Sequence, residues 1–187
     1  KIIVIVYGVK MNKNYSVEEY KKDIDTYGLK SVWESILNFN KKNNTDDSII
    51  SISNFGELYE IGLAHVNKNN KKEHGIYYTP QDVANVLSDY FMNLKGKNIC
   101  DVCCGTGNLI LSYLNKLGYE GSRNLIMDGS LYLYDMDDLA LYICKETIGL
   151  IYGDDGQFKV YCKNQPFNIV ATFSSPLIDI NSSAPSL

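Results

Sequence analysis

Residues 98–114, NICDVCCGTGNLILSYL, constrain the fold of this chain more than any other stretch. An apolar run that contains Asp101 is followed by Gly105 and Gly107, and then by a second apolar run. Buried parallel strands read as short continuous apolar runs, and glycine permits the tight turn that leads from such a strand into a helix. The stretch therefore predicts a strand over 98–103, a glycine turn, and a helix over 108–117.

Strands and helices continue to alternate after this unit. Strands are predicted over 131–134, 158–162 and 167–173, and the acidic Asp137 and Asp138 open a helix that runs to about residue 150. This alternation predicts an α/β fold with a mainly parallel sheet that binds ligands at the carboxyl ends of its strands. The last two strands are separated by 163–166 alone, whereas a parallel crossover needs about a dozen residues. They either pair as a hairpin or have lost residues between them.

A helical region is predicted before the sheet. Ser16 and Glu19 have the spacing of a capping box, and apolar side chains then recur at helical intervals to about residue 40, with Gly28 dividing the stretch into two helices. A further helix is expected around 55–66, between polar linkers. We accordingly expect three parts, namely a helical region over 1–74, a sheet domain over 75–180 and a disordered tail over 181–187.

Thr79 and Pro80 predict the start of one more helix, with Thr79 as its N-cap and Pro80 at its first position. The apolar residues that follow recur at the i, i+3, i+4, i+7 spacing of a helix that buries one face. These residues are Val83, Val86, Leu87, Tyr90, Phe91 and Leu94.

The five cysteines do not predict a metal site. They are odd in number and lie in apolar segments, which favours reduced thiols over a disulfide framework. Cys100 and Cys103 form a C-x-x-C, but a structural zinc ion needs four ligands, and no second pair or suitably spaced histidine follows. We expect Cys100, Cys103 and Cys104 to be small buried residues around the turn, with no metal bound.

Charge and hydropathy limit the partners. The chain carries a net charge of −4, and the excess of acids lies beyond residue 80. Because nucleic-acid binding normally depends on Lys and Arg, this argues against a whole-surface nucleic-acid binder but leaves room for a local basic patch. No apolar run approaches the roughly 20 residues of a membrane span, so we expect a cytoplasmic protein without membrane contact.

The glycine turn remains as the candidate binding site. It is not a G-x-x-x-x-G-K-[ST] phosphate loop, because Gly105 and Gly107 lie two apart and Asn108 follows. A Gly-x-Gly turn nevertheless lets a ligand approach the backbone and the helix N-terminus. Asp135, at the end of the next predicted strand, is placed to accept hydrogen bonds from ribose hydroxyls.

Four segments, in the family's order along the chain, resemble the S-adenosylmethionine-dependent methyltransferases that modify the N6 amine of adenine in DNA. FGELYE (55–60) matches a lead-in often found upstream, and GIYYTP (75–80) resembles the G-x-[YF]-[YF]-T-P segment beside the methionine end of the cofactor. DVCCGTGNL (101–109) resembles the first motif in its D-x-x-C-G-x-G version, and LYDMDDLALYI (133–143) resembles the motif whose acid binds ribose. Together they span about residues 55–150.

The resemblance implies an incomplete Rossmann-like sheet of the class I methyltransferases, with S-adenosyl-L-methionine as cofactor. It places Tyr78, Thr79 and Pro80 around the methionine carboxylate and amine. The cofactor-binding residues that it implies are Tyr77, Tyr78, Thr79, Pro80, Asp101, Cys103, Gly105, Gly107, Asn108, Asp135 and Met136. From the residues alone other roles stay open: core aromatics for Tyr77 and Tyr78, a turn cap for Asp101, and a helix start for Asp135.

The resemblance assigns catalysis to a [DNS]-P-P-[YFW] motif, whose polar groups accept the N–H bonds of the adenine amine and whose aromatic ring stacks on the flipped base. The corresponding segment here, after the predicted strand 167–173, is Ser174-Ser175-Pro176-Leu177, and the catalytic candidates are Ser174 and Pro176. Leu177 offers no aromatic face, and stacking of a base on an aromatic ring contributes about 1–3 kcal/mol.

The leading hypothesis is therefore the cofactor-binding part of an adenine-N6 DNA methyltransferase of a restriction–modification system. Its expected partners are DNA and a specificity or restriction subunit. Two alternatives stay open. Leu177 and the short 163–166 connection suggest an inactive binding module with the methyltransferase fold. A methyltransferase of RNA, protein or small molecules is the other, because cofactor motifs do not define the acceptor.

Overall fold

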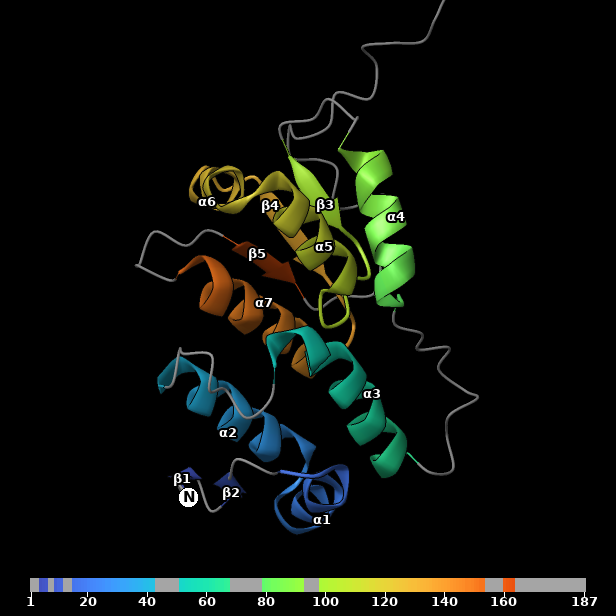
Figure 1. The fold of residues 1–187 in the computed structure, drawn as a ribbon, viewed down its shortest axis with the longest axis vertical. Helices are drawn as coiled ribbons and strands as arrows, with labels where there is room; N and C mark the ends of the chain where they lie inside the picture. Colours follow the sequence, from blue (N-terminus) through green and yellow to red (C-terminus); the bar gives the residue numbers. More distant parts are fainter. Residues whose placement is uncertain are drawn as a thin grey trace, which may run out of the picture.

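The computed structural model of the chain describes residues 4–6, 9–11, 15–42, 51–67, 79–92, 98–153 and 160–163 (Figure 1). Within these ranges the parallel sheet has the strand order β3-β4-β5, with β3 (Ile99–Asp101), β4 (Leu131–Tyr134) and β5 (Val160–Lys163). Ile99 pairs with Leu131, which pairs in turn with Val160. The predicted parallel pairing is confirmed for these strands. The predicted strand 167–173, its hairpin alternative and the tail 181–187 lie outside the described residues.

Helices connect the three strands. The chain passes from β3 to β4 through α5 (Asn108–Leu117) and α6 (Tyr119–Met127), and from β4 to β5 through α7 (Asp138–Tyr152). Leu131 and Leu133 of β4 lie in one buried cluster with apolar side chains of all three helices. The helix over 108–117 and the helix opened by Asp137 are confirmed, whereas α6 was not predicted. Within the described ranges, no helix is both long and apolar enough to cross a membrane.

The predicted helical region is confirmed over the residues that the structure describes. It contains α1 (Val17–Tyr27), α2 (Leu29–Lys42), the short 3-10 helix η1 (Ile52–Asn54) and α3 (Phe55–Val66). Ser16 Oγ accepts from the Glu19 amide at 3.2 Å, and the Glu19 carboxylate accepts from the Ser16 amide at 2.8 Å, which is the predicted capping box. Gly28 separates α1 from α2 with a φ of +82°, a conformation that favours glycine.

A short antiparallel pair of strands precedes the helices. It consists of β1 (Val4–Val6) and β2 (Val9–Met11), and Val6 pairs with Val9. This pair was not predicted from the sequence. The N-terminal region is therefore helical with a small hairpin at its start (Figure 1).

An aromatic core joins the helical region to α7. Trp33 contacts Phe55 and Tyr59 edge to face, with ring centroids 5.3 and 5.9 Å apart, and its Nε1 donates to the Tyr20 hydroxyl at 3.0 Å. Ala140 and Ile143 of α7 belong to the same buried cluster. Figure 1 shows α2 lying along α7, and α3 running from that side of the molecule toward α1. Because each large buried apolar side chain contributes about 1.5–3 kcal/mol, this core holds the two parts of the chain firmly together.

Helix α4 (Gln81–Phe91) packs on α5 through a face other than the predicted one. The apolar stripe expected to be buried is exposed along most of its length, with Val86 69% and Tyr90 68% exposed, and Val83 and Leu87 also at the surface. The buried residues are instead Ala84 and Ser88, whose small side chains let the two helices approach closely. The prediction of the buried face was therefore wrong, while Leu94 lies outside the described residues.

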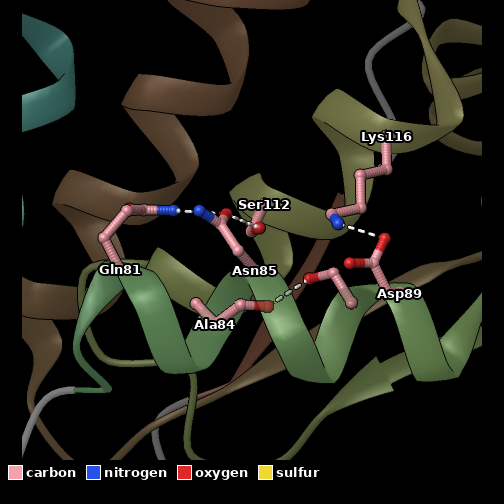
Figure 2. A network of polar contacts seen from close by, with 7 residues as sticks. Gln81, Ala84, Asn85, Asp89, Ser112 and Lys116 are labelled. Carbon is pink, nitrogen blue, oxygen red and sulfur yellow. Dashed lines mark hydrogen bonds and ion pairs between the residues drawn. The ribbon is translucent and has the colours of Figure 1, made fainter.

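Polar side chains fasten α4 to α5 (Figure 2). Asn85 Oδ1 accepts from Ser112 Oγ at 2.6 Å and from Gln81 Nε2 at 3.1 Å. One turn further along, Lys116 forms an ion pair with Asp89. Two polar bonds thus join these helices beside the small buried side chains Ala84 and Ser88, and a search for apolar periodicity does not detect such a contact.

Helix α4 also begins one residue later than predicted. Pro80, and not Thr79, is its N-cap, because Pro80 has an extended ψ of 149° and its carbonyl accepts the first helical bond from the Ala84 amide at 2.9 Å. Thr79 is left outside the helix, and its carbonyl is free to bond elsewhere, as described below.

Candidate cofactor site

The turn between β3 and α5 is built on its glycines. Gly105 has a φ of +52° and Gly107 a φ of +98°, and the Gly107 amide donates to the Cys104 carbonyl at 2.8 Å. A Cβ at Gly107 would lie 2.6 Å from Cys144 Sγ, which is closer than real side chains approach. The predicted tight turn is confirmed, and both its conformation and its packing require glycine at position 107.

The Asp135 side chain ties this turn to the end of β4. Its Oδ2 accepts from the Gly105 amide at 2.7 Å, and its Oδ1 accepts from the Asp137 amide at 2.8 Å. The backbone adds a third link, because the Cys104 amide donates to the Tyr134 carbonyl at 3.0 Å. A carboxylate has about four acceptor sites, so Asp135 can still accept two hydrogen bonds from a ligand.

A second carboxylate lies close to the first. Asp101 ends β3, and its Oδ1 accepts from the Cys103 amide at 3.3 Å. Burial raises the pKa of Asp101, the hydrogen bond from Cys103 lowers it, and the nearby charge of Asp135 raises it again. The site therefore carries negative potential, and a cationic group bound there would favour the ionised form of Asp101.

The N-terminus of α5 opens onto the same turn. Its N-cap is Gly107, which has no side chain, so no side chain caps the first amides of the helix. Next to it, Thr106 is 2% exposed and its hydroxyl has no hydrogen-bond partner in the described part of the chain. A buried hydroxyl without a hydrogen-bond partner costs about 1–3 kcal/mol of stability. Such groups are rare in native folds, so the Thr106 hydroxyl calls for a functional or structural explanation.

Thr79, which precedes α4, also lies at this turn. Asn108, the first residue of α5, donates from Nδ2 to the Thr79 carbonyl at 3.0 Å. The α4–α5 bonds in Figure 2 continue this attachment along both helices. The structure thus brings together six of the predicted site residues: Thr79, Asp101, Gly105, Gly107, Asn108 and Asp135.

The other predicted residues differ in how they lie. Met136 follows Asp135 and is 71% exposed, and Cys103 is also exposed. Both stand at the strand ends, where a ligand can reach them. Tyr77, Tyr78, Ser174 and Pro176 lie outside the described residues.

The expected burial of the cysteines is only partly correct. Cys104 and Cys144 are buried, but Cys100 and Cys103 are exposed. Although Cys103 is exposed, partial desolvation of its thiol and the nearby Asp135 and Asp101 charges raise its pKa, so the thiol is not activated as a nucleophile. Among the described residues, no three side chains of the kinds that bind metals are grouped together.

Two residues of α3 at the edge of this site were not singled out from the sequence. The Tyr59 hydroxyl donates to Asp137 Oδ2 at 2.7 Å, while Asp137 Oδ1 caps α7 by accepting from the amides of Leu139 and Ala140. A Cβ on Gly56 would lie 2.5 Å from Asn108 Oδ1, so α3 also touches the start of α5. Both residues belong to the FGELYE segment, which was the available signal.

Known proteins resemble the chain over this region. The model of the N-6 DNA Methylase family matches residues 50–167. The type I restriction enzyme MjaIX methylase subunit of Methanocaldococcus jannaschii is 30% identical over 126 residues, which is 67% of this chain and 21% of that protein. The type II methyltransferase M.VspI of a Vibrio species is 26% identical over 149 residues, 79% of this chain and 32% of that protein. The MpnII methylase subunit of Mycoplasma pneumoniae is 31% identical over 59% of this chain and 20% of its own length. The chain thus spans between a fifth and a third of these curated relatives.

Proposed function

The chain belongs to the N-6 DNA methylase family, and we propose that it forms the S-adenosylmethionine-binding part of an enzyme that methylates the N6 amine of adenine in DNA. The observation that carries the proposal is the bond between the Gly105 amide and Asp135. It joins the glycine turn after β3 to the acid after β4, at the carboxyl ends of two adjacent parallel strands. Ligands of open parallel sheets bind at this edge.

The residues at this edge fit S-adenosylmethionine chemically. The cofactor carries a cationic sulfonium, an amino acid head group, a ribose diol and an adenine ring. Asp101 and Asp135 supply the negative charge that a cation needs, and the pKa of Asp101 is raised by burial and, to a smaller extent, by the charge of Asp135. Gly105 and Gly107 give the turn its positive-φ conformation, and the buried Thr106 hydroxyl between them has no hydrogen-bond partner among the described residues.

Each residue has a role in this proposal. Asp135 accepts hydrogen bonds from the ribose hydroxyls with its two remaining acceptor sites. Asp101 and the uncapped amides of α5 bind the charged head group together with the Thr79-Pro80 segment. The exposed Met136 and the Cys103 segment contact the adenine ring. When bound, the cofactor supplies an electrophilic methyl group on a positively charged sulfur.

The rest of the proposed site comes from residues that the structure does not describe. Tyr77 and Tyr78 complete the cofactor site, and Ser174 and Pro176 serve at the acceptor amine, where Ser174 accepts a hydrogen bond from it. Leu177 stands where the family motif has an aromatic residue, so base capture depends on other contacts. The names of the relatives, which are methylase subunits and a methyltransferase, support an enzyme rather than an inactive module.

The proposal extends to fold, partners and location. The sheet is part of a Rossmann-like class I methyltransferase domain over 75–180, preceded by the helical region 1–74. Two of the relatives are named as subunits of type I restriction enzymes, which supports a specificity or restriction subunit as a partner alongside DNA. We place the protein in the cytoplasm, where its DNA substrate lies.

Calorimetric titration with S-adenosylhomocysteine, the demethylated product, tests the cofactor site. Saturable binding with one ligand per chain is expected, and an absence of binding by the folded protein would overturn the proposal. Transfer of a labelled methyl group to unmethylated DNA, followed by nucleoside analysis for N6-methyladenine, tests the reaction. If the label were transferred to RNA or protein and not to DNA, the proposed acceptor would be wrong.

A further inference from the structure

Helix α3 lies against the starts of both helices that flank the candidate cofactor site. Gly56 and Tyr59 are one helical turn apart and so share one face of α3. Gly56 contacts Asn108 at the start of α5, and Tyr59 contacts Asp137 at the start of α7. One face of the helical region therefore touches a residue of each predicted cofactor motif, Asn108 in 101–109 and Asp137 in 133–143.

A continuous chain of hydrogen bonds leads from Tyr59 into the site. The Tyr59 hydroxyl donates to Asp137 Oδ2 at 2.7 Å. The Asp137 amide donates to Asp135 Oδ1 at 2.8 Å, and Asp135 Oδ2 accepts from Gly105 at 2.7 Å. Tyr59 itself is buried, with its ring packed edge to face on Trp33, so its hydroxyl is held in place by the aromatic core.

Asp137 is the middle residue of this series of hydrogen bonds. One of its oxygens caps α7 and the other is held by Tyr59, which fixes the rotamer of its side chain. Its backbone amide in turn orients Asp135. Tyr59 is thus linked through Asp137 to Asp135, the carboxylate proposed to hold the ribose.

Gly56 acts on the other side of the site. Because it has no side chain, the Asn108 amide group can lie against α3 while its Nδ2 donates to the Thr79 carbonyl at 3.0 Å. A methyl group at position 56 would come within 2.5 Å of Asn108 Oδ1 and 2.9 Å of its Nδ2. The Asn108 side chain would have to turn away, which would release Thr79.

We infer that Gly56 and Tyr59 are positioning residues for cofactor binding, with Tyr59 orienting Asp135 toward the ribose through Asp137 and Gly56 keeping Asn108 on Thr79. This inference rests on the proposed function. It assigns a role in cofactor affinity to the helical region, which contributes no residue to the predicted cofactor set.

Tyr59→Phe tests the first half, because it removes the hydroxyl and keeps the ring. Binding of S-adenosylhomocysteine should weaken by roughly tenfold, the size expected for one misplaced hydrogen bond. Binding of the 2′,3′-dideoxyribose analogue, which cannot bond to Asp135 through its ribose, should change by less than about twofold. The measurements are made by calorimetry on the protein at its full natural length.

Tyr20→Phe is the matched control. Tyr20 is equally buried in the same aromatic core and its hydroxyl is also hydrogen-bonded, but to Trp33 and not to Asp137. This variant should lower the unfolding temperature and leave the affinity for both ligands unchanged. A merely structural effect of Tyr59→Phe would weaken both ligands alike and would overturn the inference, as would unchanged affinity for both.

Gly56→Ala tests the second half. Alanine favours the helix, so the variant should fold, while displacement of Asn108 should weaken S-adenosylhomocysteine by roughly three- to tenfold. Gly121→Ala in α6 is its control, since a Cβ there also meets a side chain, Leu117 at 2.8 Å, away from the site. Equal affinity of the two variants would overturn this half. If the wild-type protein binds no S-adenosylhomocysteine, the proposed function itself fails, which is a distinct result.

Discussion

The amide of Gly105 donates to Asp135 Oδ2 at 2.7 Å, across 30 positions of the sequence. The bond connects the turn after β3 to the end of β4, and the Asp137 amide occupies the other oxygen of the same carboxylate. Asp135 is therefore part of the scaffold of the site as well as a proposed ligand contact. Substitutions of Asp135 should therefore affect both the stability of the fold and the affinity for the ligand.

Asp135→Ala should reduce both stability and binding. It leaves the buried amide of Gly105 and the amide of Asp137 without their acceptor, which should lower the free energy of unfolding by about 1–3 kcal/mol. Asp135→Asn keeps one oxygen and should lower it less, while both variants lose affinity for S-adenosylhomocysteine. Urea unfolding and calorimetry measure the two effects. The exposed Asp128 provides the control, and equal stability of Asp135→Ala and Asp128→Ala would contradict the scaffold role.

Gly107→Ala should destabilise the protein more than Gly118→Ala. Both glycines have positive φ, so each substitution costs about 1–3 kcal/mol in backbone strain. A Cβ at Gly118 meets nothing within 4 Å, whereas at Gly107 it meets Cys144 Sγ at 2.6 Å, and such overpacking adds about 1–3 kcal/mol. Removal of the Cys144 thiol should relieve this contact. Gly107→Ala should therefore cost less free energy of unfolding when it is added to Cys144→Ala than when it is added to the wild type. Denaturant unfolding measures all four, and equal losses for the two glycine variants would refute the packing argument.

Binding of the cofactor should strengthen as the pH rises, because of Asp101. Burial and the charge of Asp135 raise the pKa of this carboxyl above its usual value of about 4, and a cationic ligand favours its ionised form. The expected result is an affinity that increases with pH from about pH 4 through the raised pKa, with proton release on binding. Calorimetry in buffers of different ionisation enthalpy measures both quantities. Asp101→Asn should flatten this profile, and an unchanged profile would exclude Asp101 as the titrating group.

The same pKa shift has the opposite effect on the stability of the free protein. As the pH rises, Asp101 loses its proton at a lower pH in the unfolded chain than in the folded protein. The free energy of unfolding therefore falls as the pH rises up to the folded-state pKa. Asp101→Asn abolishes this pH-dependent fall in stability and keeps an oxygen to accept from the Cys103 amide. Stability of the variant relative to wild type should therefore improve with pH over this window, as measured by thermal unfolding.

The two faces of α4 should respond in opposite ways to substitution. Ala84 is fully buried against α5, so Ala84→Leu should destabilise the protein by about 1–3 kcal/mol through overpacking. Val86 is 69% exposed, so Val86→Lys should change stability by less than about 0.5 kcal/mol. Chemical denaturation compares the two. A large loss of stability for Val86→Lys would contradict the exposure of Val86 and support the buried face that apolar periodicity predicted.

Local signals explain which elements were predictable from the sequence. The Ser16–Glu19 capping box, Gly28, the glycine turn and the acidic Asp137 each act within a few residues, so both ends of α1 and the starts of α5 and α7 could be placed from sequence alone. Strand β4 was predicted with its observed bounds because its apolar run is clearly delimited by polar residues. The paired strands β1 and β2 are three residues each, too short to give a periodic signal.

The errors come from interactions that only the folded chain defines. Val86 and Tyr90 have the spacing of a buried stripe, but α5 accepts the small face of Ala84 and Ser88 instead. Cys100 and Cys103 looked like core residues because they lie in an apolar stretch, yet both are exposed, Cys100 within β3 and Cys103 just after it. For the site, Gly105 and Asp135 were predictable from motif spacing. The Tyr59–Asp137 bond joins residues 78 positions apart, and no spacing rule reaches that far.

The aromatic core around Trp33 has a consequence for cooperativity. Since Ala140 and Ile143 of α7 share this core with α1, α2 and α3, the helical region cannot open without exposing one side of the helix that follows Asp135. Regions joined in this way exchange their amide hydrogens as one unit, and a ligand bound only by the native state slows the opening of the whole unit. Binding of a ligand at the carboxyl ends of the strands should thus slow hydrogen exchange in α2, at amides that do not contact the ligand.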